Sequence, residues 1–287
     1  MNMRPIQGKS VVITGAASGI GEALALAFAQ RGAKLLLADI DAVNLARVQQ
    51  AAQALGAQCQ IKVTDTGNED AIKSLAAHAS TTDFGADIVI NNAGVSVVSP
   101  VDKLLMTDAH WLMNINFWGV VHGCRAFIPL MRGKPDTVLV NTSSIFAMIS
   151  MPTQSIYNAS KAAVRGFSDA LREELRGDGI DVLCVHPGGI KTNIANKARI
   201  TDVSLIANTD QEMRDNFTKL ARTTPAQAAA VIIEAIESRK TRVLIGADAK
   251  TMDWLFRLFP TRASRWFSNL GKRMRERAQR QAAAAKT

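Results

Sequence analysis

The chain has 287 residues, 47% apolar and 21% charged, enough for one large α/β domain or two small ones. No apolar run approaches the roughly 18 residues of a membrane-spanning helix, the N-terminus has no signal-peptide pattern, and the three cysteines and four histidines lack disulfide or metal-ligand spacing. The net charge of +9 is concentrated at one end, since residues 257–287 carry +8 and residues 1–256 only +1. We therefore expect a cytoplasmic, metal-free protein whose body is not a nucleic-acid-binding domain.

Short apolar runs alternate with longer segments of helical periodicity along most of the chain. The apolar runs predict seven buried strands, at residues 10–14, 34–38, 58–63, 87–91, 137–141, 180–185 and 242–246. Helices are expected between them, at about residues 22–30, 43–55, 69–79, 108–131, 153–176 and 225–238. Repeated β-α-β units with uninterrupted apolar strands predict an α/β fold with a doubly wound (Rossmann-type) parallel sheet, as a single domain over residues 1–250.

One long segment, residues 193–222, interrupts this alternation. It has no strand pattern and stands where a parallel α/β fold expects a short connection. Long ordered loops are often functional lids, and we expect this segment to cover a substrate site.

A glycine-rich turn joins the first strand to the first helix. Gly15, Gly19 and Gly21 allow the backbone to approach a ligand where a Cβ would clash, and the turn would bring a diphosphate to the positive end of the helix. Asp39 closes the second strand 18 residues beyond Gly21, near the roughly 20 expected of a carboxylate that binds the adenosine ribose hydroxyls. The alternative is an ordinary turn followed by a surface aspartate.

Tyr157 is the only tyrosine of the chain and lies four positions before Lys161. On the predicted helix 153–176 the two side chains share one face. A fixed cation stabilises a phenolate and lowers its pKa from about 10, which is one way to make an acid/base catalyst from tyrosine. The alternative is a helix that happens to carry both residues.

Taken together, these motifs resemble those of the short-chain dehydrogenases/reductases, in the standard single-domain branch, over residues 9–246. The spacing T-G-x-x-x-G-I-G at residues 14–21 is that family's variant. Asp65 matches the residue that contacts adenine, residues 91–94 match a motif that lines the cofactor channel, and Thr192 matches a contact to the nicotinamide carboxamide. The resemblance thus implies cofactor contacts from the following residues: Gly15, Ser18, Gly19, Ile20, Gly21, Asp39, Asp65, Thr66, Asn92, Ala93, Gly94, Tyr157, Lys161, Pro187, Gly188, Ile190 and Thr192.

The same resemblance implies four catalytic residues: Asn116, Ser144, Tyr157 and Lys161. Its spacing of 13 positions before the tyrosine selects Ser144 over Ser143, and the Trp-Gly that follows favours Asn116 over Asn114. In this family the tyrosine exchanges a proton with the substrate, the lysine and the nicotinamide lower its pKa, and the serine hydrogen-bonds the substrate oxygen. The asparagine is expected to hold a water that extends a proton path beyond the lysine.

The implied activity is an alcohol dehydrogenase or carbonyl reductase acting on a secondary alcohol or ketone. NAD is favoured over NADP, because Asp39 would repel a 2′-phosphate and because Ser18 and Ile40 stand where NADP users often carry a basic residue. An NADP-dependent ketone reductase and a non-catalytic NAD-binding sensor or scaffold are the alternatives. The resemblance also implies a homodimer or homotetramer.

The substrate pocket is expected to lie between residues 95–98, residues 148–151 and the lid. The apolar residues there predict a hydrophobic substrate: Val97, Val98, Met148, Ile149, Met151, Ile194, Leu205, Ile206 and Phe217. The alternative is that these side chains pack only on each other.

A C-terminal extension, residues 251–287, follows the family's common core. It begins with an apolar cluster: Trp254, Leu255, Phe256, Leu258 and Phe259. Residues 262–280 then combine apolar residues at helical spacing with seven basic ones, a pattern typical of a helix on an anionic membrane. Peripheral membrane contact is one interpretation. The other is that the cluster packs on the lid or on a neighbouring subunit; a nucleic-acid role is disfavoured.

Overall fold

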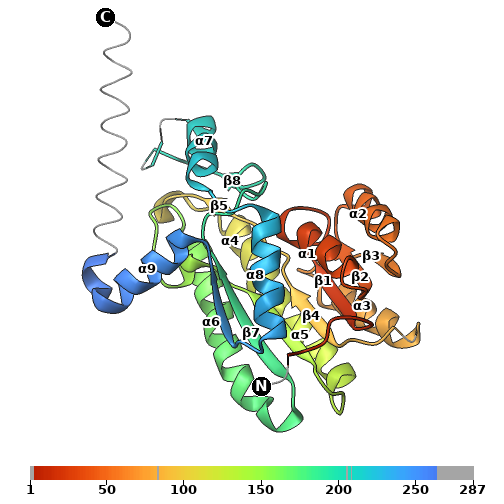
Figure 1. Cartoon of the computed structure of the whole chain (residues 1–287). Helices are drawn as coiled ribbons and strands as arrows, with labels where there is room; N and C mark the ends of the chain where they lie inside the picture. The colour runs from red at the N-terminus through yellow and green to blue at the C-terminus, as the bar shows by residue number, and fades with distance from the viewer. Residues whose placement is uncertain (1–2, 83, 205, 208, 264–287) are drawn as a thin grey trace, which may run out of the picture.

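The computed structural model describes residues 3–82, 84–204, 206–207 and 209–263. Its centre is a seven-stranded parallel sheet with helices on both faces (Figure 1). In chain order the strands are β1 (Ser10–Thr14), β2 (Lys34–Asp39), β3 (Cys59–Val63), β4 (Ile88–Asn91), β6 (Val138–Thr142), β7 (Asp181–Pro187) and β9 (Arg242–Ile245). Their spatial order is β3-β2-β1-β4-β6-β7-β9, so the chain leaves β1 to one side and then crosses to β4 on the other. All seven predicted strands are found, and the doubly wound single-domain fold is confirmed.

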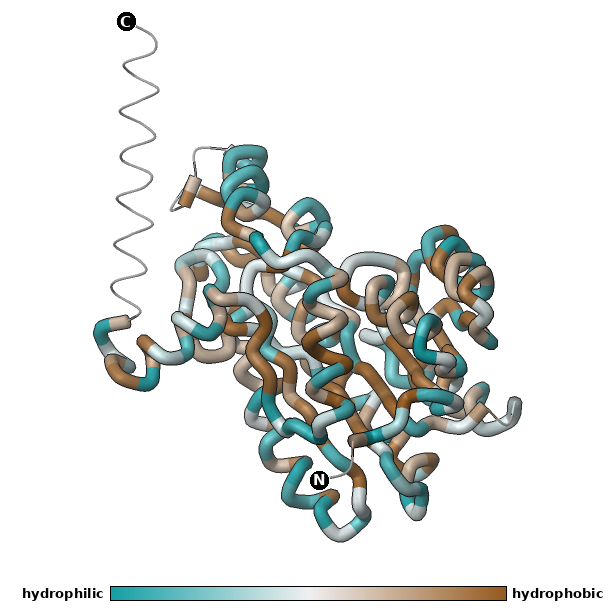
Figure 2. Tube along the Cα trace, viewed as in Figure 1, coloured by the Kyte–Doolittle hydropathy of each residue, from teal (hydrophilic) through white to brown (hydrophobic). Residues whose placement is uncertain are grey.

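The strands separate two apolar layers, as expected of parallel strands that are covered on both faces. Val11 and Ile13 of β1 belong to one layer and Val12 to the other. Three helices cover each face: α1 (Gly19–Ala29), α2 (Ala42–Ala54) and α8 (Pro225–Glu237) on the first, and α3 (Glu69–Thr81), α5 (Gly119–Met131) and α6 (Ser155–Glu174) on the second. Figure 2 shows the hydrophobic strands running between these more mixed helices.

The start of α8 follows its sequence closely. The Thr224 hydroxyl accepts a hydrogen bond from the Gln227 amide at 3.2 Å, and the Gln227 side chain accepts one from the Thr224 amide at 2.9 Å. With Pro225 at the first helical position, this reciprocal capping fixes the helix start.

The helix expected at 108–131 has a defect in its middle. It consists of α4 (Met106–Met113), a π-helical turn η2 (Asn114–Trp118) and α5. Single π turns inside α-helices are frequent at functional sites. This one carries Asn114 and Asn116, the two candidates for the catalytic asparagine.

The expectation that residues 193–222 contain no strand is wrong. A two-residue strand, β8 (Arg199–Ile200), pairs with β5 (Val97–Val98), and a helix, α7 (Asp210–Leu220), follows. Two residues are too few to show strand periodicity, and their partner lies about 100 residues away in the sequence.

The segment is also fastened to α4. The Arg199 guanidinium lies 2.7 Å from Asp108 and 3.7 Å from the centre of the Trp111 ring, close enough for an ion pair and a cation–π contact. Of the apolar residues predicted to line the pocket, Val98 and Ile206 pack in one cluster with Ala198, Val203, Ala207 and Met213 of this segment, and Leu205 lies outside the described residues.

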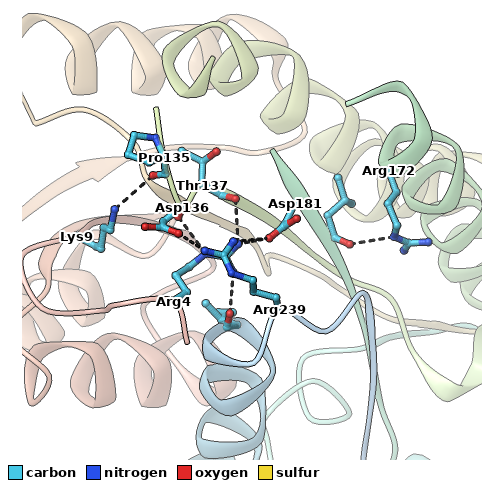
Figure 3. A network of polar contacts seen from close by, with 10 residues as sticks. Arg4, Lys9, Pro135, Asp136, Thr137, Arg172, Asp181 and Arg239 are labelled. Carbon is cyan, nitrogen blue, oxygen red and sulfur yellow. Dashed lines mark hydrogen bonds and ion pairs between the residues drawn. The ribbon is translucent and has the colours of Figure 1, made fainter. Parts of the chain in front are cut away.

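The N-terminal segment is anchored by a buried arginine (Figure 3). Arg4 donates hydrogen bonds to the carbonyls of Asp136, Ile236 and Thr137 at 3.0, 2.7 and 3.2 Å, and it pairs with the carboxylate of Asp181. These groups lie at the amino ends of β6 and β7 and at the end of α8, so one side chain ties three elements together.

The helix α9 (Ala247–Leu258) lies at the margin of the molecule (Figure 1), and residues 260–263 after it are helical as well. The predicted apolar cluster is split: Phe256 packs against the body, whereas Trp254, Leu258 and Phe259 are exposed. The predicted basic amphipathic pattern falls mostly on residues 264–287, outside the described residues. Within the described part of the chain, no helix is long and apolar enough to cross a membrane.

Candidate active site

The sequence motifs meet at the carboxyl edge of the sheet. The glycine turn follows β1, residues 91–94 follow β4, Ser144 follows β6, and the loop 187–192 follows β7. In open parallel sheets ligands bind at this edge, where the strand order reverses, here between β1 and β4.

The glycine turn is shaped by close backbone approach. A Cβ on Gly15, whose φ is +66°, would lie 2.7 Å from the Cα of Ala93, and a Cβ on Gly21 would lie 2.0 Å from the carbonyl oxygen of Gly15. A Cβ on Gly19, whose φ is +58°, would lie 3.1 Å from the Thr192 methyl group, which places Thr192 beside the turn. Because these glycines have no side chains, the backbone of the turn is accessible at the positive end of α1, as a diphosphate site requires.

Asp39, at the end of β2, is tied to this turn. One carboxylate oxygen accepts a hydrogen bond from the Ala17 amide at 2.9 Å, and the other accepts one from the Asp41 amide at 3.0 Å. Each oxygen retains a lone pair for a further donor, such as a ribose hydroxyl. The sequence did not reveal that this carboxylate also holds the glycine turn in place.

Asn92 links the turn to β4. Its side-chain amide donates to the carbonyls of Thr14 and Gly15 at 3.1 and 3.2 Å. The Thr14 hydroxyl in turn accepts from the backbone amides of Asn92 and Ala93 at 3.1 and 3.3 Å. Thr14 thus supports the site, a role that its place in the motif does not indicate.

The preceding residue, Asn91, supports the sheet from inside. Its side-chain amide donates to the side-chain oxygen of Asn141 on β6 at 2.9 Å, and the Asn141 amide donates to the Ser168 hydroxyl on α6 at 3.0 Å. A buried polar chain of this kind rigidifies the packing when each member is satisfied. It holds β4, β6 and α6 in register below the site.

Asp65 and Thr66 follow β3, at the same carboxyl edge of the sheet as the glycine turn. The Asp65 carboxylate accepts from the Gly67 amide at 2.9 Å. Gly67 also lies against the π turn, since a Cβ on it would be 3.3 Å from the Ile115 side chain and 3.7 Å from the Cβ of Asn114. Asn114 therefore faces this outer loop.

Asn116 is fully buried instead. Its side chain exchanges two hydrogen bonds with the backbone of Val95, at 2.8 and 2.9 Å, and donates to the Ser160 hydroxyl at 3.3 Å. A Cβ on Gly94 would lie 3.4 Å from both the Asn116 oxygen and the Lys161 nitrogen. The geometry brings Asn116, not Asn114, to the cation of the site.

Among the residues that the structure describes, the buried Lys161 has one hydrogen-bond partner, the carbonyl oxygen of Thr142, which accepts from its Nζ at 2.9 Å. Among the described residues no carboxylate forms a salt bridge with it. Burial lowers the pKa of Lys161 to about 8, because an ammonium taken out of water favours its neutral form. Its nitrogen lies 5.9 Å from the centre of the Tyr157 ring, so the pair shares one helix face as predicted.

The pKa of Tyr157 in the protein alone is raised, whereas the expected lowering includes the charge of the nicotinamide. The protein packed around the hydroxyl raises its pKa to about 12, and the hydrogen bond with Ser144 opposes this rise. Desolvation of the phenol is the larger of these two effects. The protein alone therefore does not make the phenol acidic, and a lowering would need a further positive charge in the site.

Ser144 and Ser143 point to different partners. The Ser144 hydroxyl accepts from the Phe146 amide at 3.1 Å and hydrogen-bonds Tyr157, whereas the Ser143 hydroxyl donates to the backbone carbonyl of Lys161 at 2.7 Å. Ser144 is thus the serine that faces the phenol. His186, for which the motifs indicate no role, lies 3.2 Å through Nδ1 from the Ser144 carbonyl oxygen and is fully buried.

The loop after β7 is held by Asp248, another residue absent from the predicted site. Its carboxylate accepts from the Gly189 amide at 2.7 Å. A Cβ on Gly188 would lie 2.3 Å from that carboxylate, so only glycine fits there. Pro187 ends β7 and Ile190 forms an isolated bridge with Thr223, which together set the path of the chain toward Thr192.

These features fit a nicotinamide dinucleotide. The bare glycine turn and the start of α1 suit its diphosphate, Asp39 has free lone pairs for ribose hydroxyls, and Lys161 presents a buried cation without a carboxylate partner among the described residues. Groups of three metal-ligating side chains are absent from the part of the chain that the structure describes.

Comparison with known proteins points the same way. The family model described as short chain dehydrogenase matches residues 9–202. SadH of Mycobacterium tuberculosis, an oxidoreductase by its name, is 41% identical over 261 residues, covering 89% of this chain and 92% of the relative. The 3-oxoacyl-[acyl-carrier-protein] reductase FabG of Thermotoga maritima is 34% identical, covering 70% of this chain and 83% of the relative.

Two solved structures are similar over most of their length. A Burkholderia phymatum short chain dehydrogenase/reductase in complex with NAD has a TM-score of 0.78 and 31% identity, covering 89% of this chain and 96% of that one. A Burkholderia cenocepacia short chain dehydrogenase in complex with NADP has a TM-score of 0.74 and 25% identity, covering 86% and 99%.

Proposed function

The chain belongs to the short chain dehydrogenase family of oxidoreductases, and from that premise we propose that it interconverts a secondary alcohol and its ketone, with NAD as the cofactor. The observation that carries this proposal is the convergence of Ser144, Tyr157 and Lys161 beside a glycine turn at the carboxyl edge of the sheet. A proton carrier and an oxygen-binding hydroxyl then stand next to a nucleotide site.

The roles follow from the positions of the side chains. When bound, the nicotinamide accepts or supplies the hydride at the substrate carbon. Tyr157 takes up or gives the proton of the substrate oxygen, and the Ser144 hydroxyl binds that oxygen as a preorganised donor. Lys161 places a positive charge on the same helix face as the phenol, and its own lowered pKa allows it to exchange protons near pH 8.

The remaining residues position this group. The Asn116 side chain makes two hydrogen bonds with the backbone of residue 95 and so holds this part of the chain close to Lys161. The glycine turn, Asp39 and Thr192 would hold the nucleotide. We propose a hydrophobic substrate because apolar residues, Met148 and Met151 among them, occupy the segment that follows Ser144.

The Tyr157→Phe variant tests the catalytic proposal. Turnover of secondary alcohols with NAD should fall by about three orders of magnitude or more, because the proton carrier is removed while the ring stays. Initial rates of NADH formation measure the loss, and calorimetric NAD titration should show unchanged affinity.

The matched pair Ser144→Ala and Ser143→Ala provides the control. Only the first removes the hydroxyl that faces the phenol, so only the first should lower kcat strongly. A Tyr157→Phe enzyme that keeps a tenth of wild-type activity contradicts the assignment. NAD binding by a wild-type protein that turns over no secondary alcohol or ketone would favour a non-catalytic sensor.

The Asp39→Asn variant tests the cofactor preference. The amide oxygen can still accept one of the two backbone hydrogen bonds, but the charge that repels a 2′-phosphate disappears. We expect the ratio of kcat/KM for NAD to that for NADP to fall by about tenfold or more, since the change removes one close like-charge repulsion. The isosteric change at the neighbouring Asp41 should leave the ratio unchanged. A wild-type enzyme that already prefers NADP contradicts the charge argument.

A further inference from the structure

The helix α9 is firmly attached to the protein by its inner side. Ala249 is fully buried and, with Phe256, packs against Ile145, Met148 and Ile149 around the turn η3 (Ile145–Ala147). Asp253 accepts hydrogen bonds from Arg242 at 2.6 Å and from Arg257 at 3.0 Å. The helix is therefore part of the folded body rather than a loose end.

The outer side of α9 is apolar and exposed. Trp254 is 60% exposed, Leu258 52% and Phe259 39%. Trp254 and Leu258 are separated by four residues and so share one face of the helix, and Phe259 follows directly. We call Trp254, Leu258 and Phe259 the α9 outer face. A group of large exposed apolar side chains on a fixed helix usually marks an interaction site.

The charge of the chain changes sharply at this helix. Residues 257–287 carry +8, whereas residues 1–256 carry +1. The α9 outer face thus lies at the junction between a nearly neutral enzyme and a strongly basic segment. Whatever binds there must accommodate aromatic side chains and attract many positive charges.

An anionic phospholipid surface meets both requirements. Trp and Phe favour the boundary between headgroups and acyl chains, and clustered Lys and Arg are attracted to anionic lipids. A second copy of the chain would bring a second basic segment and hence repulsion. Nucleic acid would neutralise the charge, but duplex phosphates offer no apolar surface for Leu258 and Phe259.

We propose that the α9 outer face, together with the basic residues that follow it, docks the protein on an anionic phospholipid membrane. The apolar side chains enter the headgroup region, and the basic segment binds the surface electrostatically. Because α9 packs on the turn directly after Ser144, docking holds the active-site side of the sheet next to the lipid. The inference does not depend on the proposed reaction.

Vesicle co-sedimentation of the full chain tests the proposal. Vesicles of phosphatidylcholine with phosphatidylglycerol should bind the protein at low salt, whereas phosphatidylcholine alone should bind it weakly. The triple variant Trp254→Ser/Leu258→Ser/Phe259→Ser should bind the anionic vesicles at least tenfold more weakly, because it loses the apolar insertion. Its circular dichroism and NAD binding should match those of the wild type.

A matched control uses three other exposed apolar residues, Val101, Leu105 and Met106. Changing these to serine should leave vesicle binding unchanged. Replacing Arg273, Arg275 and Arg277 with glutamine should weaken binding to anionic vesicles by roughly a hundredfold, which salt should mimic.

Several results would overturn the proposal. The proposal fails if the wild-type protein stays in the supernatant with anionic vesicles. It also fails if the triple variant binds these vesicles like the wild type. Sedimentation velocity that shows dissociation of an oligomer by the triple variant, without vesicle binding, assigns the face to a second copy. A shift of duplex DNA or RNA without vesicle binding assigns the basic segment to nucleic acid.

Discussion

Two buried cations lie at opposite ends of the same strand, β6, and their surroundings differ. At the amino end, Arg4 has the carbonyls of Asp136, Thr137 and Ile236 and the carboxylate of Asp181. At the carboxyl end, Lys161 has one carbonyl, that of Thr142. Both groups have pKa values lowered by burial, but for Arg4 the charge of Asp181 opposes the effect.

The difference separates a structural cation from a functional one. A guanidinium stays charged in proteins, so burying it requires full pairing, and once paired it fastens the elements around it. An ammonium with one partner can lose its proton or receive an anionic or polar ligand. Incomplete pairing at the carboxyl end therefore marks the site, and complete pairing at the amino end marks an anchor.

Removing the unpaired cation should affect the reaction most. We expect Lys161→Met to lower kcat/KM for alcohol oxidation by about three orders of magnitude, since both the positive charge and the nicotinamide ribose contact expected from the family resemblance are lost. The free energy of unfolding should stay the same or rise, because a poorly paired buried charge is removed.

Steady-state kinetics and urea unfolding measure the two effects. Lys161→Arg is the control, as it keeps a cation on the helix. If Lys161→Met unfolds easily but keeps its activity when folded, Lys161 is an anchor and the comparison with Arg4 fails.

Removing the paired cation should affect stability instead. We expect Arg4→Met to lower the free energy of unfolding by about 3 kcal/mol, because it removes a buried cation that bonds three carbonyls and the Asp181 carboxylate, which then keeps only its partner Arg239 among the described residues. Activity at a temperature where the variant is folded should match the wild type. Arg31→Met, at an exposed ion pair with Glu237, should cost less than about 1 kcal/mol. Equal losses for the two variants would contradict the role of the Arg4 network.

The pH dependence of stability should reveal the lowered pKa of Lys161. Above pH 8 the folded protein releases this proton, whereas the unfolded chain keeps it to about pH 10.4, so the unfolded state binds more protons. The contribution of Lys161 to the free energy of unfolding is constant below pH 8. Above pH 8 it rises with pH, by about 2 kcal/mol up to pH 10.

Other buried groups change stability in the opposite direction at high pH. Burial raises the pKa of Cys59 and Cys124 to about 12 and that of Cys184 to about 11, so stability falls above about pH 9 as the unfolded thiols ionise. The informative quantity is the difference between wild type and Lys161→Met in urea unfolding at pH 7 and pH 10. An unchanged difference at the two values would show that Lys161 keeps an ordinary pKa.

The sequence predicted those parts that depend on local patterns. Apolar runs located the seven strands, and the motif residues Gly15, Ser144, Tyr157 and Lys161 do gather at one edge of the sheet. Their order along the chain, combined with parallel topology, is sufficient for this, because each motif follows a strand whose carboxyl end lies at that edge.

The parts that depend on tertiary contacts could not be predicted. The β5–β8 pair joins two dipeptides far apart in the sequence, and the burial of Arg4 depends on partners from residues 136–236. The raised pKa of Tyr157 in the protein alone was not predicted, because the i, i+4 spacing reports a neighbouring charge but not desolvation. The catalytic roles themselves stay predictions.

The π-helical turn at Asn114–Trp118 affects where the chain can accept insertions and deletions during evolution. A π turn holds one residue more than the α-helical turn that it replaces. A single-residue deletion there would restore a regular helix with α4 and α5 nearly in register, whereas one in the regular helix α4 would rotate α5 by about 100° relative to the start of α4. Gly119 and Gly123, where a Cβ would lie 2.8 Å from the Thr66 carbonyl oxygen and 2.1 Å from the Asn91 side-chain oxygen, would then give way to larger residues. Single-residue insertions and deletions should therefore be tolerated in the surface loops between elements, and a deletion should be absorbed inside this turn, but both should be eliminated by selection in the regular helix α4.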